Sequence, residues 1–321
     1  MEISFSSEHF TLHELAEGIF AAIATEMGAG FSNAGLIDLG DRTLVFDAFE
    51  NPQAAQDLLI ASRQLTGRDP AVVIISHSHP DHWGGLQVFA DCAILATQAT
   101  FQAMIPIAEE MRQEQRDPSG LEKELQATEA RLAAETDPRQ RQALKISVIR
   151  QRHNLQSLQS IQPTLPNQTF DGKIIFYGTT RSVELIPTGK GHTESDCILH
   201  FSKERITFIG DLGFFQQQPF TPYGSPRDWI AQLNNLANGK ARVFVPGHGP
   251  LGSKADLLLV AQYIQAVEDM VHQVIQRGGT ITDALCQALP PPFDAWQGIG
   301  RRFEANVRGS FNRQSHPQHK G

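Results

Sequence analysis

Residues 77–82 have the sequence His77-Ser78-His79-Pro80-Asp81-His82 and are separated only by Ser76 from the apolar run Ala-Val-Val-Ile-Ile at residues 71–75. The apolar run predicts a short buried strand. The loop after it places three imidazoles and one carboxylate within six residues. Such a loop is a poor way to build a core and a good way to build a metal site on a rigid support.

Three later Gly-flanked segments each add one more side chain of the same kind. They are Gly191-His192-Thr193, Gly210-Asp211-Leu212 and Pro246-Gly247-His248-Gly249, and the complete set is His77, His79, Asp81, His82, His192, Asp211 and His248. Neutral imidazole and carboxylate suit divalent metals such as Zn²⁺. Two such ions can share a bridging carboxylate and a bridging hydroxide, because bound water loses its proton near neutral pH. The sequence therefore predicts a metal site.

The composition is that of an ordinary globular α/β protein. The chain has 321 residues, of which 40% are hydrophobic and 19% charged, with a net charge of −8. We expect one domain over residues 1–321 and a small-molecule substrate, because no Lys/Arg cluster favours a nucleic acid. The odd number of cysteines, without a Cys-x-x-Cys pair, argues against a disulfide framework and a thiolate zinc site.

The sequence shows no pattern typical of a secretion signal or a membrane-spanning helix. The N-terminus has no basic start followed by an apolar stretch, and no segment approaches the ~20 apolar residues that a spanning helix needs. We therefore expect a cytoplasmic protein without a membrane partner.

Short apolar runs alternate with helical patterns along most of the chain. Periodicity alone leaves residues 19–23 open between helix and strand, and the short elements around them favour strand. Further strands are expected at residues 43–47, 93–97, 173–176, 183–186, 196–201, 206–209 and 243–245, and helices at residues 51–65, 225–236, 257–277 and 282–289. The polar end, residues 310–321, is expected to be a flexible tail.

Residues 101–165 differ from the rest, because Glu, Gln, Arg and Leu dominate and strand patterns vanish. The leucine spacing predicts two helices, with Asp137 as an N-cap and Pro138 in the first turn of the second helix. We interpret this region as a helical insertion. It is a solvated decoration, a homodimer contact or a lid over the site.

These motifs resemble the metallo-β-lactamase-fold superfamily of metal-dependent hydrolases. The cluster at residues 77–82 matches the signature of that superfamily, and His192, Asp211 and His248 follow in its expected order. The resemblance covers roughly residues 10–100 and 170–275 and leaves the insertion unexplained. It implies an α/β fold, a four-layer αββα sandwich with the site at one edge.

The resemblance also implies how the ligands divide. One metal would be held by His77, His79 and His192, the other by Asp81, His82 and His248, and Asp211 would bridge them. Asp rather than Cys at position 211 is similar to the glyoxalase II, lactonase and phosphodiesterase type of dinuclear site. The segment Gly191-His192-Thr193-Glu194-Ser195-Asp196 departs from the commoner Gly-His-Thr-x-Gly pattern, which leaves the substrate open.

The expected activity is that of a dinuclear zinc hydrolase, with iron or manganese as other metals. A metal-bridging hydroxide would attack an ester, thioester, lactone or related bond, and the catalytic residues Asp81 and Asp211 would orient or transfer a proton. Two kinds of alternative remain. One is an iron-dependent oxidoreductase of the same fold, either a persulfide dioxygenase or a diiron protein. The other is a β-lactam or phosphodiester hydrolase.

Five residues near these motifs have weaker assignments. Asp47 ends a predicted strand and is either a partner that orients a ligand histidine or a turn carboxylate. Phe214, Phe215, Phe220 and Tyr223 follow Asp211 closely and either line an apolar substrate pocket or fill the core.

Overall fold

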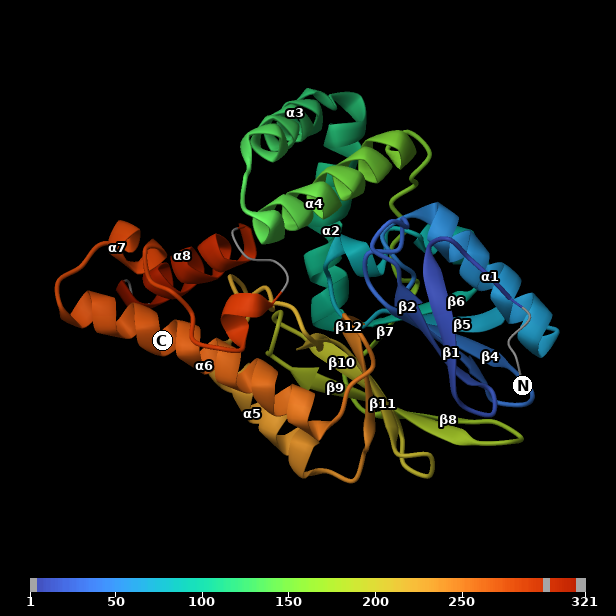
Figure 1. The fold of residues 1–321 in the computed structure, drawn as a ribbon. Helices are drawn as coiled ribbons and strands as arrows, with labels where there is room; N and C mark the ends of the chain where they lie inside the picture. The colour runs from blue at the N-terminus through green and yellow to red at the C-terminus, as the bar shows by residue number, and fades with distance from the viewer. Residues whose placement is uncertain (1–4, 297–300, 316–321) are drawn as a thin grey trace.

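Two β-sheets face each other, and helices cover their outer faces (Figure 1). The computed structural model describes residues 5–296 and 301–315. The first sheet has seven strands in chain order, antiparallel from β1 to β4 and parallel from β4 to β7. These strands are β1 (Phe10–Ala16), β2 (Ile19–Ala24), β3 (Ala34–Asp38), β4 (Thr43–Phe46), β5 (Pro70–Ile74), β6 (Ala93–Thr97) and β7 (Gln168–Phe170).

The second sheet has five strands in the order β12-β11-β10-β9-β8. All neighbours are antiparallel except β11 and β12, which run parallel. The strands are β8 (Ile174–Tyr177), β9 (Ser182–Gly189), β10 (Asp196–Phe201), β11 (Ile206–Phe214) and β12 (Val243–His248).

Helices outside the insertion pack on the outer faces of the sheets or lie beyond them. They are α1 (Pro52–Thr66), α5 (Pro226–Asn238), α6 (Lys254–Gln276), α7 (Ile281–Leu285) and α8 (Arg301–Ser315), with short 3-10 helices η1 (Pro80–His82), η2 (Leu86–Phe89) and η3 (Phe293–Ala295). Helix α1 shares an apolar cluster with the first sheet, and α5 and α6 share one with the second.

The four layers follow from strands that are apolar on both faces. Val73 packs in the cluster that α1 shares with the first sheet, whereas the next residue, Ile74, packs between the two sheets against partners such as Phe208. Successive side chains of a strand point to opposite faces, so a continuous apolar run is buried on both sides. The αββα sandwich expected from the sequence is confirmed.

The insertion consists of three helices rather than two, and its first helix begins before residue 101. The helices are α2 (Gln98–Arg116), α3 (Ser119–Ala134) and α4 (Pro138–Ser157), coloured from teal at α2 to green at α4 in Figure 1. Asp137 caps α4 as predicted, since its carboxylate accepts hydrogen bonds from the backbone N–H groups of Arg139 and Gln140. Helix α2 begins at Gln98 because the side chain of Thr97 accepts a hydrogen bond from the backbone N–H of Thr100.

Two sequence-based expectations need correction. Strand β11 does not end at Ile209 but continues through Asp211 to Phe214, because pairing with β12 outweighs the local glycines. The tail expected to be flexible from Ser310 is helical as far as Ser315, and Ser310 itself is fully buried. Residues 316–321 lie outside the described part of the chain.

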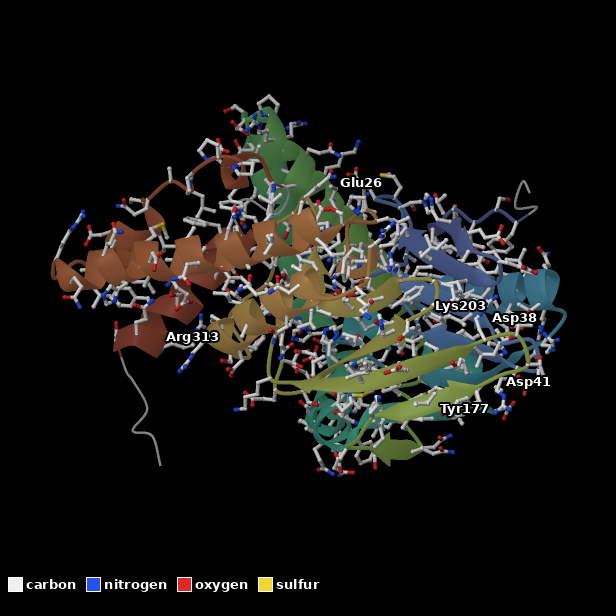
Figure 2. The ribbon with its side chains drawn as sticks, turned by 90° about the horizontal axis from the view of Figure 1, so that it is seen from below. Glu26, Asp38, Asp41, Tyr177, Lys203 and Arg313 are labelled. Atoms are coloured by element: carbon white, nitrogen blue, oxygen red, sulfur yellow. The ribbon has the colours of Figure 1, made fainter. Side chains whose placement is uncertain are left out.

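Contacts with distant residues hold α8 in place. Arg313, labelled in Figure 2, lies with Nη2 2.7 Å from Glu268 Oε1 of α6. Its Nη1 donates hydrogen bonds to the backbone oxygens of Thr221 and Pro222. These contacts fix the C-terminal helix against α6 and against the loop after β11.

None of the helices in residues 5–296 and 301–315 combines the length and the apolar composition needed to cross a bilayer.

Candidate metal centre

The structure brings all seven predicted residues together at one edge of the sandwich. They form two groups, in which the ligand atoms lie within 4.8 Å of one another: His77, His79, His192 and Asp211 in the first, and Asp81, His82 and His248 in the second. Residues 77 and 79 follow β5, and residues 81 and 82 lie in η1. His192 lies between β9 and β10, whereas Asp211 lies within β11 and His248 ends β12.

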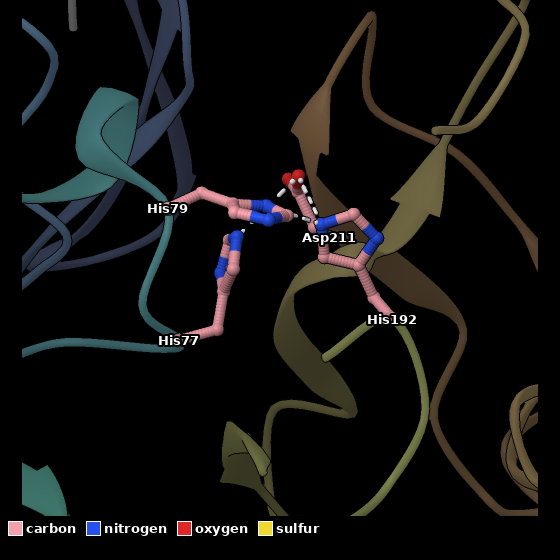
Figure 3. Close-up of side chains that lie close together, drawn as sticks. All are labelled: His77, His79, His192 and Asp211. Carbon is pink, nitrogen blue, oxygen red and sulfur yellow. Dashed lines mark hydrogen bonds and ion pairs between the residues drawn. The ribbon is translucent and has the colours of Figure 1, made fainter. Parts of the chain in front are cut away.

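Asp211 lies between the two groups and presents one carboxylate oxygen to each. Its Oδ2 is 3.1 Å from His192 Nε2 and 3.5 Å from His77 Nε2. Its Oδ1 is 3.0 Å from His82 Nε2 and 3.5 Å from His248 Nε2. Figure 3 shows the rings of the first group directed at this carboxylate. A carboxylate in this position can reach donors of both groups, and its bridging role stays a prediction.

Several donor atoms at the centre are buried without a hydrogen-bond partner, as expected for atoms that bind a metal ion. His77 Nε2, His82 Nε2 and Asp211 Oδ1 are buried and make no hydrogen bond. An unpaired buried polar atom is costly, so native proteins rarely keep several in one place without a ligand for them. Imidazole nitrogens and carboxylate oxygens are donors that Zn²⁺ accepts. The residues therefore fit divalent metal ions.

Asp47 orients His82 and supports the loop before it. Its Oδ2 lies 2.8 Å from His82 Nδ1, and its two oxygens accept hydrogen bonds from the backbone N–H and the hydroxyl of Ser76. The Ser76 hydroxyl also lies 2.9 Å from His77 Nδ1. A carboxylate on the far nitrogen of a ligand histidine fixes the ring and raises its basicity. Of the two interpretations of Asp47, the orienting one is confirmed.

The loop before β3 holds the second group from another side. His248 Nδ1 lies 3.0 Å from the backbone oxygen of Phe31. The side-chain amide of Asn33 donates to the backbone oxygens of Pro246 and Gly249, on either side of His248. Between them, Gly247 has no room for a side chain, because a Cβ there would collide with Asp211 Oδ1.

Burial and charge set the protonation of these groups in the metal-free protein. Burial lowers the pKa of His77 well below its ordinary value and lowers that of His79 to about 3. Burial opposes the charge on His82 too, but the carboxylates of Asp211 and Asp47 raise its pKa well above the usual range. Burial would raise the pKa of Asp211, yet the surrounding histidines hold it well below its ordinary value.

The insertion contributes one residue to the centre. Arg150 of α4 lies with Nη2 2.8 Å from Glu50 Oε1 and 3.4 Å from Asp81 Oδ2. The carboxylate of Asp81 is also 3.3 Å from His248 Nε2. This contact favours the interpretation of α4 as part of a lid, and the homodimer contact stays a prediction.

Aromatic side chains lie on both sides of the centre. Phe220 and Tyr223 lie with ring centroids 6.2 Å and 5.8 Å from the ring of His79. Tyr223 is 60% exposed, so this aromatic wall faces solvent. Phe214 is buried and stacks on His248 at 4.9 Å. Phe214 therefore fills the core beneath the site, while Phe220 and Tyr223 lie beside His79.

Sequence reasoning missed three charged residues near the centre, namely Glu50, Arg150 and Arg302. Arg150 lies in a run rich in Arg and Gln, where neighbours such as Arg152 point elsewhere and pair with Glu129 of α3. No local pattern distinguishes it from these neighbours, because its partner Glu50 lies 100 residues away.

Comparisons with known proteins agree with this geometry. The family model described as the metallo-beta-lactamase superfamily matches residues 27–96 and 107–248. A comparison with curated protein sequences found no match.

Among solved structures, the chain is similar to a metallo-beta-lactamase from Pontibacter korlensis, with 16% identity, a TM-score of 0.56, and 80% of this chain and 99% of that chain covered. It is also similar to the metallo-beta-lactamase FIM-1 from Pseudomonas aeruginosa in its mono-zinc form, with 15% identity, a TM-score of 0.54 and coverages of 80% and 95%. A third is the DIM-1 metallo-beta-lactamase exposed to ceftazidime, with 15% identity, a TM-score of 0.54 and coverages of 81% and 98%.

At these identities the solved structures show the fold alone. The family model carries more weight, because it matches more than half of the chain and includes all seven residues of the two groups. The chain belongs to the metallo-beta-lactamase superfamily.

Proposed function

We propose that this protein is a dinuclear zinc hydrolase that cleaves an ester, thioester, lactone or related bond. The observation that carries the proposal is the position of Asp211, with Oδ2 toward His77 and His192 and Oδ1 toward His82 and His248. A carboxylate shared in this way suits two ions about 3.5–4 Å apart. One ion would be held by His77, His79 and His192, the other by Asp81, His82 and His248, with Asp211 common to both.

The donor set supports zinc. Five imidazoles and two carboxylates, without a thiolate, are typical of reactive zinc sites rather than closed structural ones. The FIM-1 relative was solved in a mono-zinc form, which also supports zinc. Bound zinc supplies Lewis acidity and a nucleophilic water near neutral pH. The same donors accept iron or manganese, so metal analysis belongs in the test.

The chain's own residues would position the reactants. Asp81 and Asp211 both have pKa values held well below the ordinary range by the histidines around them, and Arg150 adds to this for Asp81, so both stay charged at neutral pH. A charged Asp81 carboxylate at the centre can orient a water molecule through its oxygen and accept a hydrogen bond from it. The wall formed by Phe220 and Tyr223 would hold an apolar part of the substrate near His79.

A substrate screen tests this proposal. The purified chain, loaded with zinc, is assayed with generic ester, thioester, lactone, β-lactam and phosphodiester substrates, with and without a chelator. We expect turnover in the first three classes, its loss on chelation, and its return with added zinc. Activity that survives complete metal removal would contradict the proposal, as would cleavage of β-lactams or phosphodiesters alone.

A variant and a metal analysis separate the remaining alternatives. His79→Ala removes one donor of the first group and should abolish turnover and lower metal content while the fold is retained. An iron-dependent oxidoreductase would contain about one or two iron atoms per chain in place of zinc. Iron as the metal that restores activity would therefore favour that alternative.

A further inference from the structure

Two guanidinium groups reach the centre from segments outside the sandwich. Arg150 comes from α4 of the insertion, and Arg302 comes from the first turn of α8. Each contacts a residue that touches His248. Arg150 lies beside Asp81, whose Oδ2 is 3.3 Å from His248 Nε2, and Arg302 lies 5.3 Å from the ring of Phe214, which stacks on His248. The second group of donors therefore has two cations next to it.

The charge of Arg150 is already matched within the protein. Its Nε and Nη2 both donate to the carboxylate of Glu50, at 3.0 Å and 2.8 Å to the nearer oxygens, and Asp81 lies 3.4 Å away. Its guanidinium also lies over the ring of Phe31, at 5.0 Å from the centroid. A bidentate pair of this kind is fixed in orientation. Arg150 is therefore a positioning residue for Asp81 and for the insertion.

The charge of Arg302 is not matched in this way. Its Nη1 donates to Gln217 Oε1 at 2.7 Å and to the backbone oxygen of Gln218 at 2.9 Å, and both acceptors are uncharged. Within residues 5–296 and 301–315, no carboxylate lies at ion-pair distance from Arg302. Burial and the nearby charge of Arg150 lower the pKa of Arg302, and the more distant carboxylates of Asp211 and Asp81 oppose this shift only in part. A half-buried guanidinium whose direct hydrogen bonds go only to uncharged acceptors can still pair with an anionic ligand.

The two sides of the centre differ in character. Phe220 and Tyr223 lie beside His79, which belongs to the first group, whereas Arg302 lies beside the second group through Phe214. A ligand that spans the centre would meet an aromatic wall at one end and a guanidinium at the other. Residue 302 lies beyond the residues that the family model matches, so this feature belongs to the chain's own C-terminal segment.

We propose that Arg302 is a specificity-determining residue that binds an anionic group, such as a carboxylate, on the substrate. The scissile bond would lie between this anionic group and an apolar or aromatic group held at Phe220 and Tyr223. This inference rests on the proposed hydrolase function, because only a hydrolase would cleave the bound molecule as a substrate. The binding of the anionic group is measured without turnover.

Two probes that resist hydrolysis test it. Glutaranilic acid carries a carboxylate and an aromatic anilide, and pentananilide is nearly the same molecule without the carboxylate. Calorimetry with the zinc-loaded full chain should show that glutaranilic acid binds about 10–100-fold more tightly, the range expected for a charge-assisted hydrogen bond. Arg302→Met should remove this preference and leave the binding of pentananilide unchanged, and Arg302→Lys should restore part of it.

A matched control lies on the same helix. Arg308→Met removes the same charge from α8, where Arg308 is exposed and pairs with Glu304, and it should leave the preference intact. Metal content and melting temperature are measured for each variant. If Arg302→Met does not fold, the comparison of Arg302→Lys with the wild type decides, because lysine keeps the charge but loses the planar fork.

The failure of this inference is distinguishable from that of the proposed function. Equal binding of both probes by the wild type, or a preference that survives in Arg302→Met, would overturn the role of Arg302. A chain that cleaves para-nitrophenyl pentanoate but shows no preference keeps its hydrolase function and loses this inference. A chain that shows the Arg302-dependent preference but cleaves none of the substrates keeps this inference and loses the proposed hydrolase function.

Discussion

The edge of the sandwich buries a dense group of polar residues, whereas helices α3 and α4 of the insertion bury few residues of any kind. At the edge, seven donor residues lie within two groups, and all but His79 are buried. In the insertion, α3 buries only Thr128, and α4 buries only Val148 and Ser157. The sheets thus hold a rigid centre, whereas the insertion reaches that centre through Arg150. A dense buried site requires the sheets beneath it, and a helical addition needs one well-placed side chain to act on it.

The largest expected effect comes from the shared carboxylate at the edge. Asp211→Ala should reduce turnover by at least about 10³-fold, since a metal ion supplies several kcal/mol of transition-state stabilisation. Metal content should fall as well, while circular dichroism stays that of the folded protein. An alanine variant that retains full metal and full activity would remove Asp211 from the centre.

The next largest effect is expected at Asp47, which contacts the donor residue His82. Asp47→Asn keeps the size of the side chain but weakens its bond to His82 Nδ1, which is 2.8 Å long. We expect zinc affinity or turnover to fall about 10–100-fold. Competition with a chromophoric chelator measures the affinity. An unchanged affinity would mean that Asp47 supports only the backbone of the loop.

Arg150 tests whether the insertion acts on the edge. Arg150→Met leaves Glu50 without its cation and Asp81 without its neighbour, so stability should fall by about 1–3 kcal/mol and turnover by about tenfold. Arg152→Met is the control, because Arg152 lies two residues further along α4 and pairs with Glu129 of α3. Equal effects of the two substitutions would assign Arg150 to the insertion alone.

The stability of the metal-free protein should depend on pH because of His79 at this edge. The pKa of His79 is lowered to about 3 in the fold, against an ordinary 6.5. Between these values the unfolded chain binds a proton that the folded protein does not, so stability falls as the pH is lowered from 6.5 toward 3. Thermal melting of the chelated protein should show this loss, and His79→Gln should make the loss smaller. An identical pH profile in the variant would contradict the depressed pKa.

The smallest effect is expected on α3. Gln126 is exposed, so Gln126→Ala should change stability by less than about 0.5 kcal/mol and leave turnover unchanged. Chemical denaturation and the ester assay check both values. A clear loss of activity would show that α3 has a role at the site that the contacts of the monomer do not give.

The same contrast governs how much could be predicted from the sequence. The donors at residues 77–82 follow a strand at once, so local composition predicts both the strand and the site. His192 and His248 also lie where strands begin or end. The orienting carboxylate Asp47 could be suspected because it closes a strand, but its partner His82 lies 35 residues away in the sequence.

The residues that could not be predicted depend on long-range contacts. Arg302 and Arg150 have no local pattern, because only the packing of α8 and α4 brings them to the centre. The helical state of residues 310–315 was missed for the same reason, since Arg313 gains its partners in α6 and in the loop after β11. At Asp211 the glycines on both sides favoured a loop, and pairing with a neighbouring strand overrode them.

The most direct test of the central claim is the number of zinc ions bound per chain, measured on the wild type and on one variant from each group. We predict about two per wild-type chain, and about one each for His192→Ala and His248→Ala, since each removes a donor of a different ion. A wild type that saturates with one zinc, or two variants that both retain the full complement, would contradict a centre of two ions joined by Asp211.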